Sequence, residues 1–110
     1  MLDGDGDSRI RQLLTNRIGE LTARIERIER EQRQSVDDDS AEQAIEREDD
    51  EALDAIEHAA LLEIGEINHA LGRLHAGTYG RCVSCGEKID PRRLHVMPAA
   101  ATCLICASAL

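Results

Sequence analysis

The sequence is almost without aromatic residues: its 110 positions include one Tyr and neither Trp nor Phe. Compact enzyme domains commonly use aromatic side chains to fill the core and to line an apolar substrate pocket, so their scarcity argues against an enzyme of this kind. It also removes the ring surfaces on which proteins stack the bases of single-stranded nucleic acids. We therefore expect a protein that is not an enzyme.

An excess of positive charge and long apolar runs are also missing. Acidic residues outnumber Lys and Arg by 22 to 13, and the formal net charge of −9 is poorly suited to broad binding of nucleic-acid phosphates. No apolar run approaches the roughly 20 residues that cross a bilayer. The acidic start of the chain does not have the basic and apolar regions of a signal peptide. We expect a cytoplasmic protein that does not contact membranes.

Charge and turn-forming residues divide the chain into two parts. Residues 1–76 hold 20 of the 22 acids and 9 of the 13 bases, which gives a net charge of −11, and they contain no proline. Residues 77–110 carry a net charge of +2, both prolines and all four cysteines. This change in composition predicts a helical region followed by a small, loop-rich module.

Heptad spacing predicts a first helix from about Ser8, with Asp7 or Ser8 as its N-cap. Its apolar residues are spaced 4, 3, 4 and 3 positions apart, the pattern of two packed helices. These residues are Leu14, Ile18, Leu21, Ile25 and Ile28.

A second helix is predicted from about residue 41, because Ser40 and Gln43 fit a capping box after a turn at residues 35–40. Its apolar positions continue the heptad, with a stutter near Ala60, and Gly77 is expected to supply its C-cap. The apolar positions are Ile45, Leu53, Ile56, Ala60, Ile64, Ile67, Leu71 and Leu74.

Two such helices joined by a short loop must pack antiparallel. The predicted fold is therefore mainly α, an antiparallel two-helix coiled-coil hairpin followed by a small four-cysteine zinc-finger module. We expect a flexible acidic tail at residues 1–7, the hairpin at 8–76 with its tip at 35–40, and the zinc finger at 77–110.

The cysteines form two Cys-x-x-Cys pairs, Cys82 with Cys85 and Cys103 with Cys106, separated by 17 residues. Two such turns can direct four thiolates at one Zn²⁺ ion in a tetrahedron. The alternatives are two disulfides or free thiols, and disulfides are uncommon in the cytoplasm. Because four Cys ligands leave no open position, we expect one structural zinc ion.

Positively charged residues lie between the two cysteine pairs. Lys88, Arg92 and Arg93 can offset the negative charge of a zinc ion bound by four thiolates, and they could donate hydrogen bonds to the sulfurs. His95 also lies there, but four cysteines already complete the site, so we do not expect it to be a ligand.

The cysteine region resembles the zinc finger of the DksA/TraR family, also called DnaK suppressor protein-like. The matching features are the 17-residue spacing, Tyr79-Gly80 before the first pair, Gly86 after it, Arg93-Leu94 and Pro98. The heptad hairpin extends the resemblance in pattern over about residues 8–106.

The resemblance implies a transcription regulator. Members of the family bind bacterial RNA polymerase and insert the acidic tip of the coiled coil through its secondary channel toward the active centre. There they alter the stability of promoter complexes, often together with guanosine tetraphosphate, the nucleotide of the stringent response. We accordingly expect a monomer whose partner is RNA polymerase, and no direct sequence-specific contact with nucleic acid.

The family's tip motif, Asp-x-x-Asp-x-Ala, falls at Asp39, Glu42 and Ala44 when counted back from the zinc finger. Glu42 stands where the family has its second Asp, which keeps the charge and moves the carboxylate one methylene further out. The sequence ends four residues after Cys106, whereas full-length members continue into a C-terminal helix that helps to grip the polymerase.

Two other functions agree with the sequence. One is a coiled-coil zinc adaptor or thiol redox switch without direct activity on the polymerase. The other is a small DNA-binding zinc module, in which Arg81, Lys88, Arg92 and Arg93 would contact phosphates.

Overall fold

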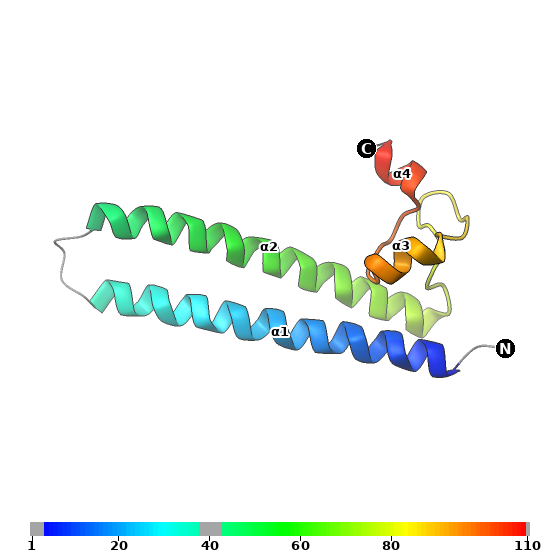
Figure 1. Ribbon diagram of the computed structural model, residues 1–110, viewed down its shortest axis with the longest axis horizontal. Coiled ribbons are helices and arrows are strands. Elements are labelled where there is room, and N and C mark those ends of the chain that lie inside the picture. Colours follow the sequence, from blue (N-terminus) through cyan, green and yellow to red (C-terminus); the bar gives the residue numbers. More distant parts are fainter. Residues whose placement is uncertain (1–3, 38–42, 110) are drawn as a thin grey trace. The chain divides into compact units, whose positions relative to one another are not determined.

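The computed structural model describes residues 4–37 and 43–109, and this part of the chain is mainly helical, as predicted. Two long helices are followed by two short ones (Figure 1). In chain order they are α1 (Gly4–Asp37), α2 (Gln43–Ala76), α3 (Pro91–Val96) and α4 (Leu104–Ser108).

The long helices take part in two compact units. The hairpin unit is Ile18–Ile64, and the cysteine unit combines Met1–Arg17 with Gly65–Leu110. Within each unit a segment of α1 lies beside a segment of α2 that runs in the opposite direction, which confirms the antiparallel hairpin (Figure 1).

Helix α1 begins at Gly4, four residues before the predicted start near Ser8. Residues 4–7, expected to belong to a flexible tail, are therefore helical. Acidic residues are favourable in a first helical turn because they face the positive end of the helix dipole. The predicted start near Ser8 leaves these acidic residues outside the helix as a tail, and it is therefore four residues too late.

The heptad pattern of α1 identified its buried face. Leu21 is 0% exposed, Leu14 is 2% exposed, and Ile25 and Ile28 are also buried, whereas Ile18 is half-buried. In the hairpin unit the two helices are further joined by a hydrogen bond of 2.6 Å from Gln32 Nε2 to Asp54 Oδ1. The contact face of α1 thus follows from apolar spacing alone.

The seam of α2 differs from the prediction at Ile56 and at Ala70. Ile56 is 46% exposed, while the neighbouring Glu57 is half-buried. Ala70, which the sequence analysis left out, is 0% exposed. Glu57 keeps the regular heptad spacing with Leu53 and Ala60, whereas Ile56 breaks it, so apolarity rather than spacing misled the prediction at this position.

The end of α2 follows the predicted C-cap. Gly77 has a φ of +78°, which glycine adopts without a Cβ clash. Its N–H donates to Leu74 O, and the N–H of Thr78 donates to Arg73 O at 2.9 Å, the pair of bonds that defines a Schellman motif. The chain therefore leaves the helix in a fixed direction toward the cysteines.

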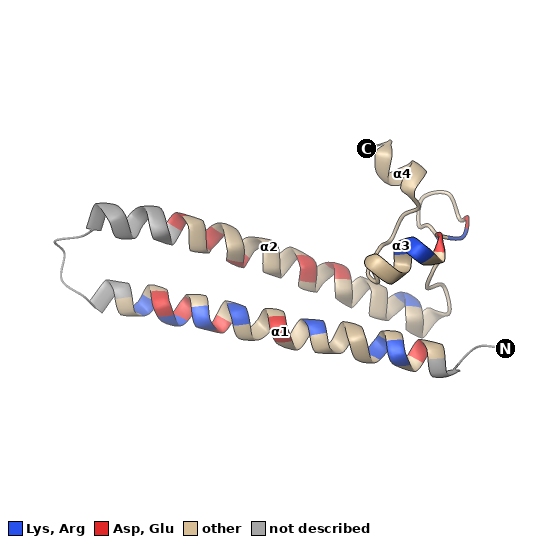
Figure 2. Ribbon diagram, viewed as in Figure 1, with Lys and Arg blue, Asp and Glu red and all other residues tan. Residues whose placement is uncertain are grey.

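The two long helices differ in charge. Lys and Arg alternate with Asp and Glu along α1, whereas the described charged residues of α2 are mostly acidic (Figure 2). Among the described helices, none combines the length and the apolar character that a bilayer crossing requires.

The module after α2 contains two short helices that the sequence analysis did not predict. Asp90 is the N-cap of α3, accepting a hydrogen bond from the Arg92 N–H at 2.9 Å, and Pro91 follows as its first residue. An Asp-Pro pair is a typical helix start, so this signal was present in the sequence. The described residues of the module include no strand, and Arg81 and Lys88 form an isolated antiparallel bridge.

Candidate metal centre

The first cysteine pair lies in a tight backbone turn. The N–H of Gly86 donates to Cys82 O at 2.9 Å, and the N–H of Cys82 donates to Glu87 O at 2.8 Å. Gly86 has a φ of +78°, a backbone conformation that disfavours residues with a Cβ. This turn holds the two side chains of the pair toward the same point.

The second pair is set at the start of α4. Cys103 is the N-cap of this helix, and its Sγ accepts a hydrogen bond of 3.5 Å from the N–H of Cys106. The segment before it is tied to the first pair, because the N–H of Val83 donates to Ala101 O at 2.9 Å. The two turns are therefore brought together by backbone hydrogen bonding.

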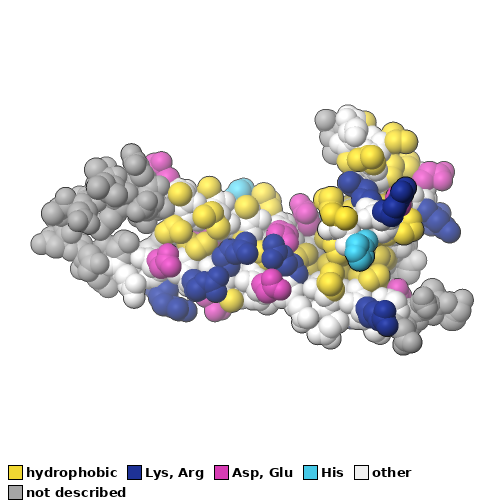
Figure 3. All heavy atoms as spheres, viewed as in Figure 1, with side chains coloured by type: hydrophobic (Ala, Val, Ile, Leu, Met, Phe, Trp, Pro, Cys, Tyr) yellow, Lys and Arg dark blue, Asp and Glu magenta, His cyan; other side chains and the backbone are white. Residues whose placement is uncertain are grey.

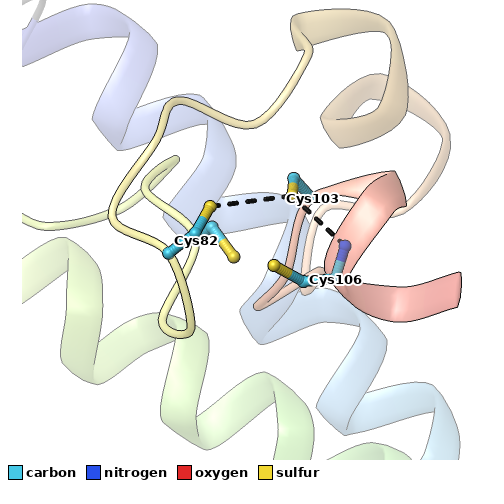
Figure 4. Close-up of side chains that lie close together, drawn as sticks. Cys82, Cys103 and Cys106 are labelled. Carbon is cyan, nitrogen blue, oxygen red and sulfur yellow. Dashed lines mark hydrogen bonds between the residues drawn. The ribbon is translucent and has the colours of Figure 1, made fainter. Parts of the chain in front are cut away.

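The four sulfur atoms lie within 4.8 Å of one another, and Figure 4 shows Cys82, Cys103 and Cys106 gathered around one point. Cys85 Sγ and Cys103 Sγ are 3.8 Å apart. Tetrahedral zinc with Zn–S bonds of about 2.3 Å separates its sulfurs by about 3.8 Å. The four cysteines therefore fit one zinc ion, which would be structural because they close its coordination sphere.

The pKa values of Cys82 and Cys106 are shifted in opposite directions. Backbone N–H groups of Cys103 and Cys85 stabilise the thiolate of Cys82 and lower its pKa to about 6. Hydrogen bonding to the side chain of Cys103, and then to those of Cys82 and Cys85, raises the pKa of Cys106 to about 12. A thiolate at one cysteine thus makes deprotonation of the neighbouring thiols less favourable. A bound divalent cation would remove this electrostatic penalty.

For none of the three basic residues expected near the sulfurs does the structure give, in the part of the chain that it describes, a hydrogen bond to a cysteine sulfur. Arg93 Nε donates to Thr102 O at 3.0 Å, so it holds the backbone next to Cys103 rather than a sulfur. Arg92 pairs with Asp90 at 2.8 Å. Lys88 is exposed and takes part in the bridge to Arg81. Arg93 is thus the one of the three that supports a cysteine turn, through the backbone.

Two residues that the sequence analysis gave no role in the site fix the segment before Cys103. Arg73, in the last turn of α2, donates from Nη2 to Ala99 O at 3.3 Å, and its Nε is buried with no partner among the described residues. The Tyr79 hydroxyl donates to Pro98 O at 2.7 Å. Tyr79 is the single aromatic residue of the chain, and this was the signal that could have drawn attention to it.

The remaining candidate residues lie elsewhere. His95 belongs to α3 and is absent from the cysteine cluster, as expected. Asp39 and Glu42, the proposed tip residues, lie outside the described residues. Ala44 lies in the first turn of α2, and its side chain is not described.

Comparison with known proteins identifies both parts of the chain. Residues 10–74 match the family model of the DnaK suppressor protein-like N-terminal domain. Residues 77–110 match the prokaryotic DksA/TraR C4-type zinc finger.

A curated relative and two solved structures are similar to this chain. An uncharacterized protein of Aquifex aeolicus is 38% identical over 58 residues, which span 53% of this chain and 40% of that protein. The structure of transcription factor DksA2 from Pseudomonas aeruginosa has a TM-score of 0.86 and 31% identity, over 97% of this chain and 84% of that chain. The solution structure of DnaK suppressor protein from Agrobacterium tumefaciens has a TM-score of 0.64 and 37% identity, over 94% of this chain and 92% of that chain.

The matches agree with the geometry of the two parts of the molecule. The N-terminal model covers the helical hairpin, and the zinc-finger model covers the four converging cysteines. The chain therefore belongs to the DksA/TraR family and joins a helical hairpin to a C4-type zinc finger.

Proposed function

We propose that this chain regulates transcription by binding RNA polymerase and inserting the tip of its hairpin through the secondary channel. The observation that carries the proposal is the similarity to a DksA2 transcription factor over 97% of the chain at a TM-score of 0.86. This coverage includes both the hairpin and the finger, so the similarity is not limited to a single motif. The chain acts by contact with the polymerase and not by catalysing a reaction of its own.

In this proposal the tip residues are Asp39, Glu42 and Ala44. The carboxylates of Asp39 and Glu42 would approach the catalytic Mg²⁺ of the polymerase, where added negative charge changes the local electrostatics. Glu42 reaches one methylene further than the Asp of the family motif, and we expect it to keep the activity because the charge is unchanged.

The zinc site has a supporting part in this function. We propose Cys82, Cys85, Cys103 and Cys106 as its ligands, since their sulfurs lie within 4.8 Å of one another. The metal would hold the cysteine module in one conformation. It would take no part in chemistry, because the four sulfurs leave no position for a substrate or water.

Phosphate binding by the zinc module is less well supported. Arg81 Nη1 donates to Gly86 O at 3.4 Å, Arg92 pairs with Asp90 and Arg93 donates to Thr102 O. Three of the four basic side chains of the module therefore already have acceptors within it. A surface that neutralises DNA phosphates needs such groups to be available.

The direct test is transcription in vitro by the cognate bacterial RNA polymerase from a ribosomal RNA promoter. Wild-type protein is expected to change the amount of transcript, and Asp39→Asn is expected to abolish the change. Asp37→Asn is the matched control, because it removes the same charge two positions away. Normal regulation by Asp39→Asn would overturn the tip mechanism, provided that its zinc content and helicity equal those of the wild type.

Three finer parts of the proposal need their own measurements. Glu42→Asp, which restores the family motif, should regulate at least as strongly as the wild type.

Adding guanosine tetraphosphate should enhance the change in transcription if the nucleotide is a partner, and an unchanged effect on transcription would exclude that role. Light scattering should give the mass of a monomer, 12.1 kDa for the polypeptide.

A further inference from the structure

The cysteine unit contains a pocket that neither the metal site nor the proposed tip mechanism uses. Its volume is about 400 Å³, at the lower end of the range for small-molecule sites. The first turns of α1, the loop after α2 and the region of α3 all contribute to its wall. The residues that determine its chemistry are Arg9, Leu13, Tyr79, Leu94, His95 and Pro98.

The wall of the pocket is largely apolar. In the space-filling view, hydrophobic side chains gather over α3 (Figure 3). Leu94 is half-buried and lies close to the backbone, since a Cβ on Gly80 would meet Leu94 Cδ1 at 3.6 Å. The hydroxyl of Tyr79 is already engaged with Pro98 O at 2.7 Å, so Tyr79 offers the pocket its ring rather than a hydrogen-bonding group.

The remaining polar side chains of the wall are Arg9 and His95. Both of these side chains are exposed. Arginine is a hydrogen-bond donor only and matches a carboxylate in a bidentate geometry, and histidine offers at least one N–H. The polar end of a ligand in this pocket must therefore accept hydrogen bonds, and a negative charge is favoured by Arg9 and opposed by Asp7, whose charge acts on Tyr79.

We infer that this pocket binds a small amphipathic carboxylate, a short aliphatic chain or ring that ends in an acid. The apolar part lies against Leu13, Tyr79 and Leu94, and the carboxylate faces Arg9 and His95. This site is separate from the hairpin tip and from the four cysteines. It gives the protein a means of responding to a metabolite of that class.

The ligand class is tested with molecules that vary one part at a time. Octanoate, 1-octanol and octylammonium share a tail and differ in charge, whereas acetate keeps the acid and lacks the tail. We expect octanoate to bind with a Kd on the order of 1 mM. Acetate should bind at least about 30-fold more weakly, because it loses the transfer of methylene groups from water.

The single tyrosine is a built-in reporter for the site. The chain has no Trp and no Phe, so the ring signals of Tyr79 in the NMR spectrum can be followed without overlap from other tyrosines. Full-length, zinc-loaded protein is titrated, and affinity is measured independently by calorimetry. Octanoate is expected to shift the Tyr79 signals in a saturable way.

Two variants and their matched controls locate the ligand. Arg9→Gln should raise the Kd for octanoate about tenfold by removing the charged hydrogen bonds. Leu13→Trp should fill the pocket and prevent binding, and the 52% exposure of Leu13 leaves room for a larger side chain. Arg11→Gln, on the same helix, and Leu62→Trp, 57% exposed in the hairpin unit, should bind as the wild type does.

Three results would overturn the inference. An absence of saturable Tyr79 shifts at millimolar octanoate would show that the pocket does not take this class of ligand. Equal binding of 1-octanol would show that it does not select an acid. Unchanged affinity in both Arg9→Gln and Leu13→Trp would place the ligand elsewhere on the protein.

Discussion

Tyr79 connects the segments that enclose the metal centre. It follows the end of α2, and its hydroxyl donates to the carbonyl of Pro98, five residues before Cys103. Burial of the ring raises the pKa of its hydroxyl, with a smaller lowering by Arg73 and a raising by Asp7. The neutral, donating form of Tyr79 is thus the one that the fold stabilises.

Replacing this hydroxyl is expected to weaken the cysteine unit. Tyr79→Phe should lower the free energy of unfolding by about 1–2 kcal/mol, because the Pro98 carbonyl loses its partner. The pKa of the Tyr79 hydroxyl is raised in the folded protein. Its protonated form therefore contributes fully to the free energy of unfolding below the unfolded pKa of about 10, and this contribution is lost as the pH rises through the folded pKa. Urea unfolding of both proteins at pH 7 and above pH 10 measures this, and an unchanged difference at high pH would contradict it.

Two glycines in different backbone conformations are expected to change stability in opposite directions when each is replaced by alanine. Gly86 has a φ of +78°, so Gly86→Ala should destabilise the protein by about 1–2 kcal/mol through backbone strain alone. Gly72 lies within α2, and a Cβ there would meet nothing within 4 Å. Gly72→Ala should therefore stabilise by up to about 1 kcal/mol. Thermal unfolding of the two variants tests the pair, and a gain in stability from Gly86→Ala would be inconsistent with the turn described here.

At the scale of elements, the cysteine module lacks a large core of its own. Its buried apolar residues after α2 are Cys82, Ile89 and Ala100. So small a core cannot hold a loop-rich segment together, and the metal would supply the difference. The long helices, by contrast, bury a continuous series of Leu, Ile and Ala side chains against each other.

Removal of zinc should therefore unfold the module and spare most of the helical hairpin. Chelation is expected to remove the amide protection of residues 78–109 in hydrogen exchange, with a small loss of helical circular dichroism. Zinc affinity should also fall as pH falls, because protons compete for the four thiols. A protein that keeps its module ordered after complete removal of zinc would refute this dependence on the metal.

The sequence predicted elements best where one periodic signal dominated. Apolar spacing identified the buried face of α1, and the two Cys-x-x-Cys pairs identified the metal centre. It misplaced Ile56 because that residue is apolar, although the charged Glu57 beside it holds the regular heptad position. The contacts of Arg73 and Tyr79 could not be predicted, because each joins residues 19 or more positions apart through a fold that no local pattern encodes.

At the scale of the whole molecule, each unit has its own large buried side chain. Leu21 in the hairpin unit is 0% exposed, and Ile67 in the cysteine unit is 1% exposed. Both α1 and α2 pass through the two units without interruption in the described residues at either junction. Helix formation is cooperative along the chain, so loss of helical order in the α1 and α2 segments of one unit should spread into the other.

Large-to-small substitutions test this coupling. Leu21→Ala and Ile67→Ala should each lower the free energy of unfolding by about 2–4 kcal/mol. Both should shift the same single transition, followed by helical circular dichroism and by the Tyr79 signal. If Leu21→Ala shifted the helical signal and left the tyrosine signal in place, the two units would be unfolding independently.

The continuity of the helices also determines what can be made from this protein in pieces. The unit boundaries, after Arg17 and after Ile64, fall inside helical turns and not in loops. A protease would find no loop at either boundary, and cuts there would divide the cysteine unit into two pieces, whereas residues 18–64 would keep both of their helical segments. The cysteine unit consequently cannot be made as one continuous segment without the hairpin unit that lies between its two parts in the sequence.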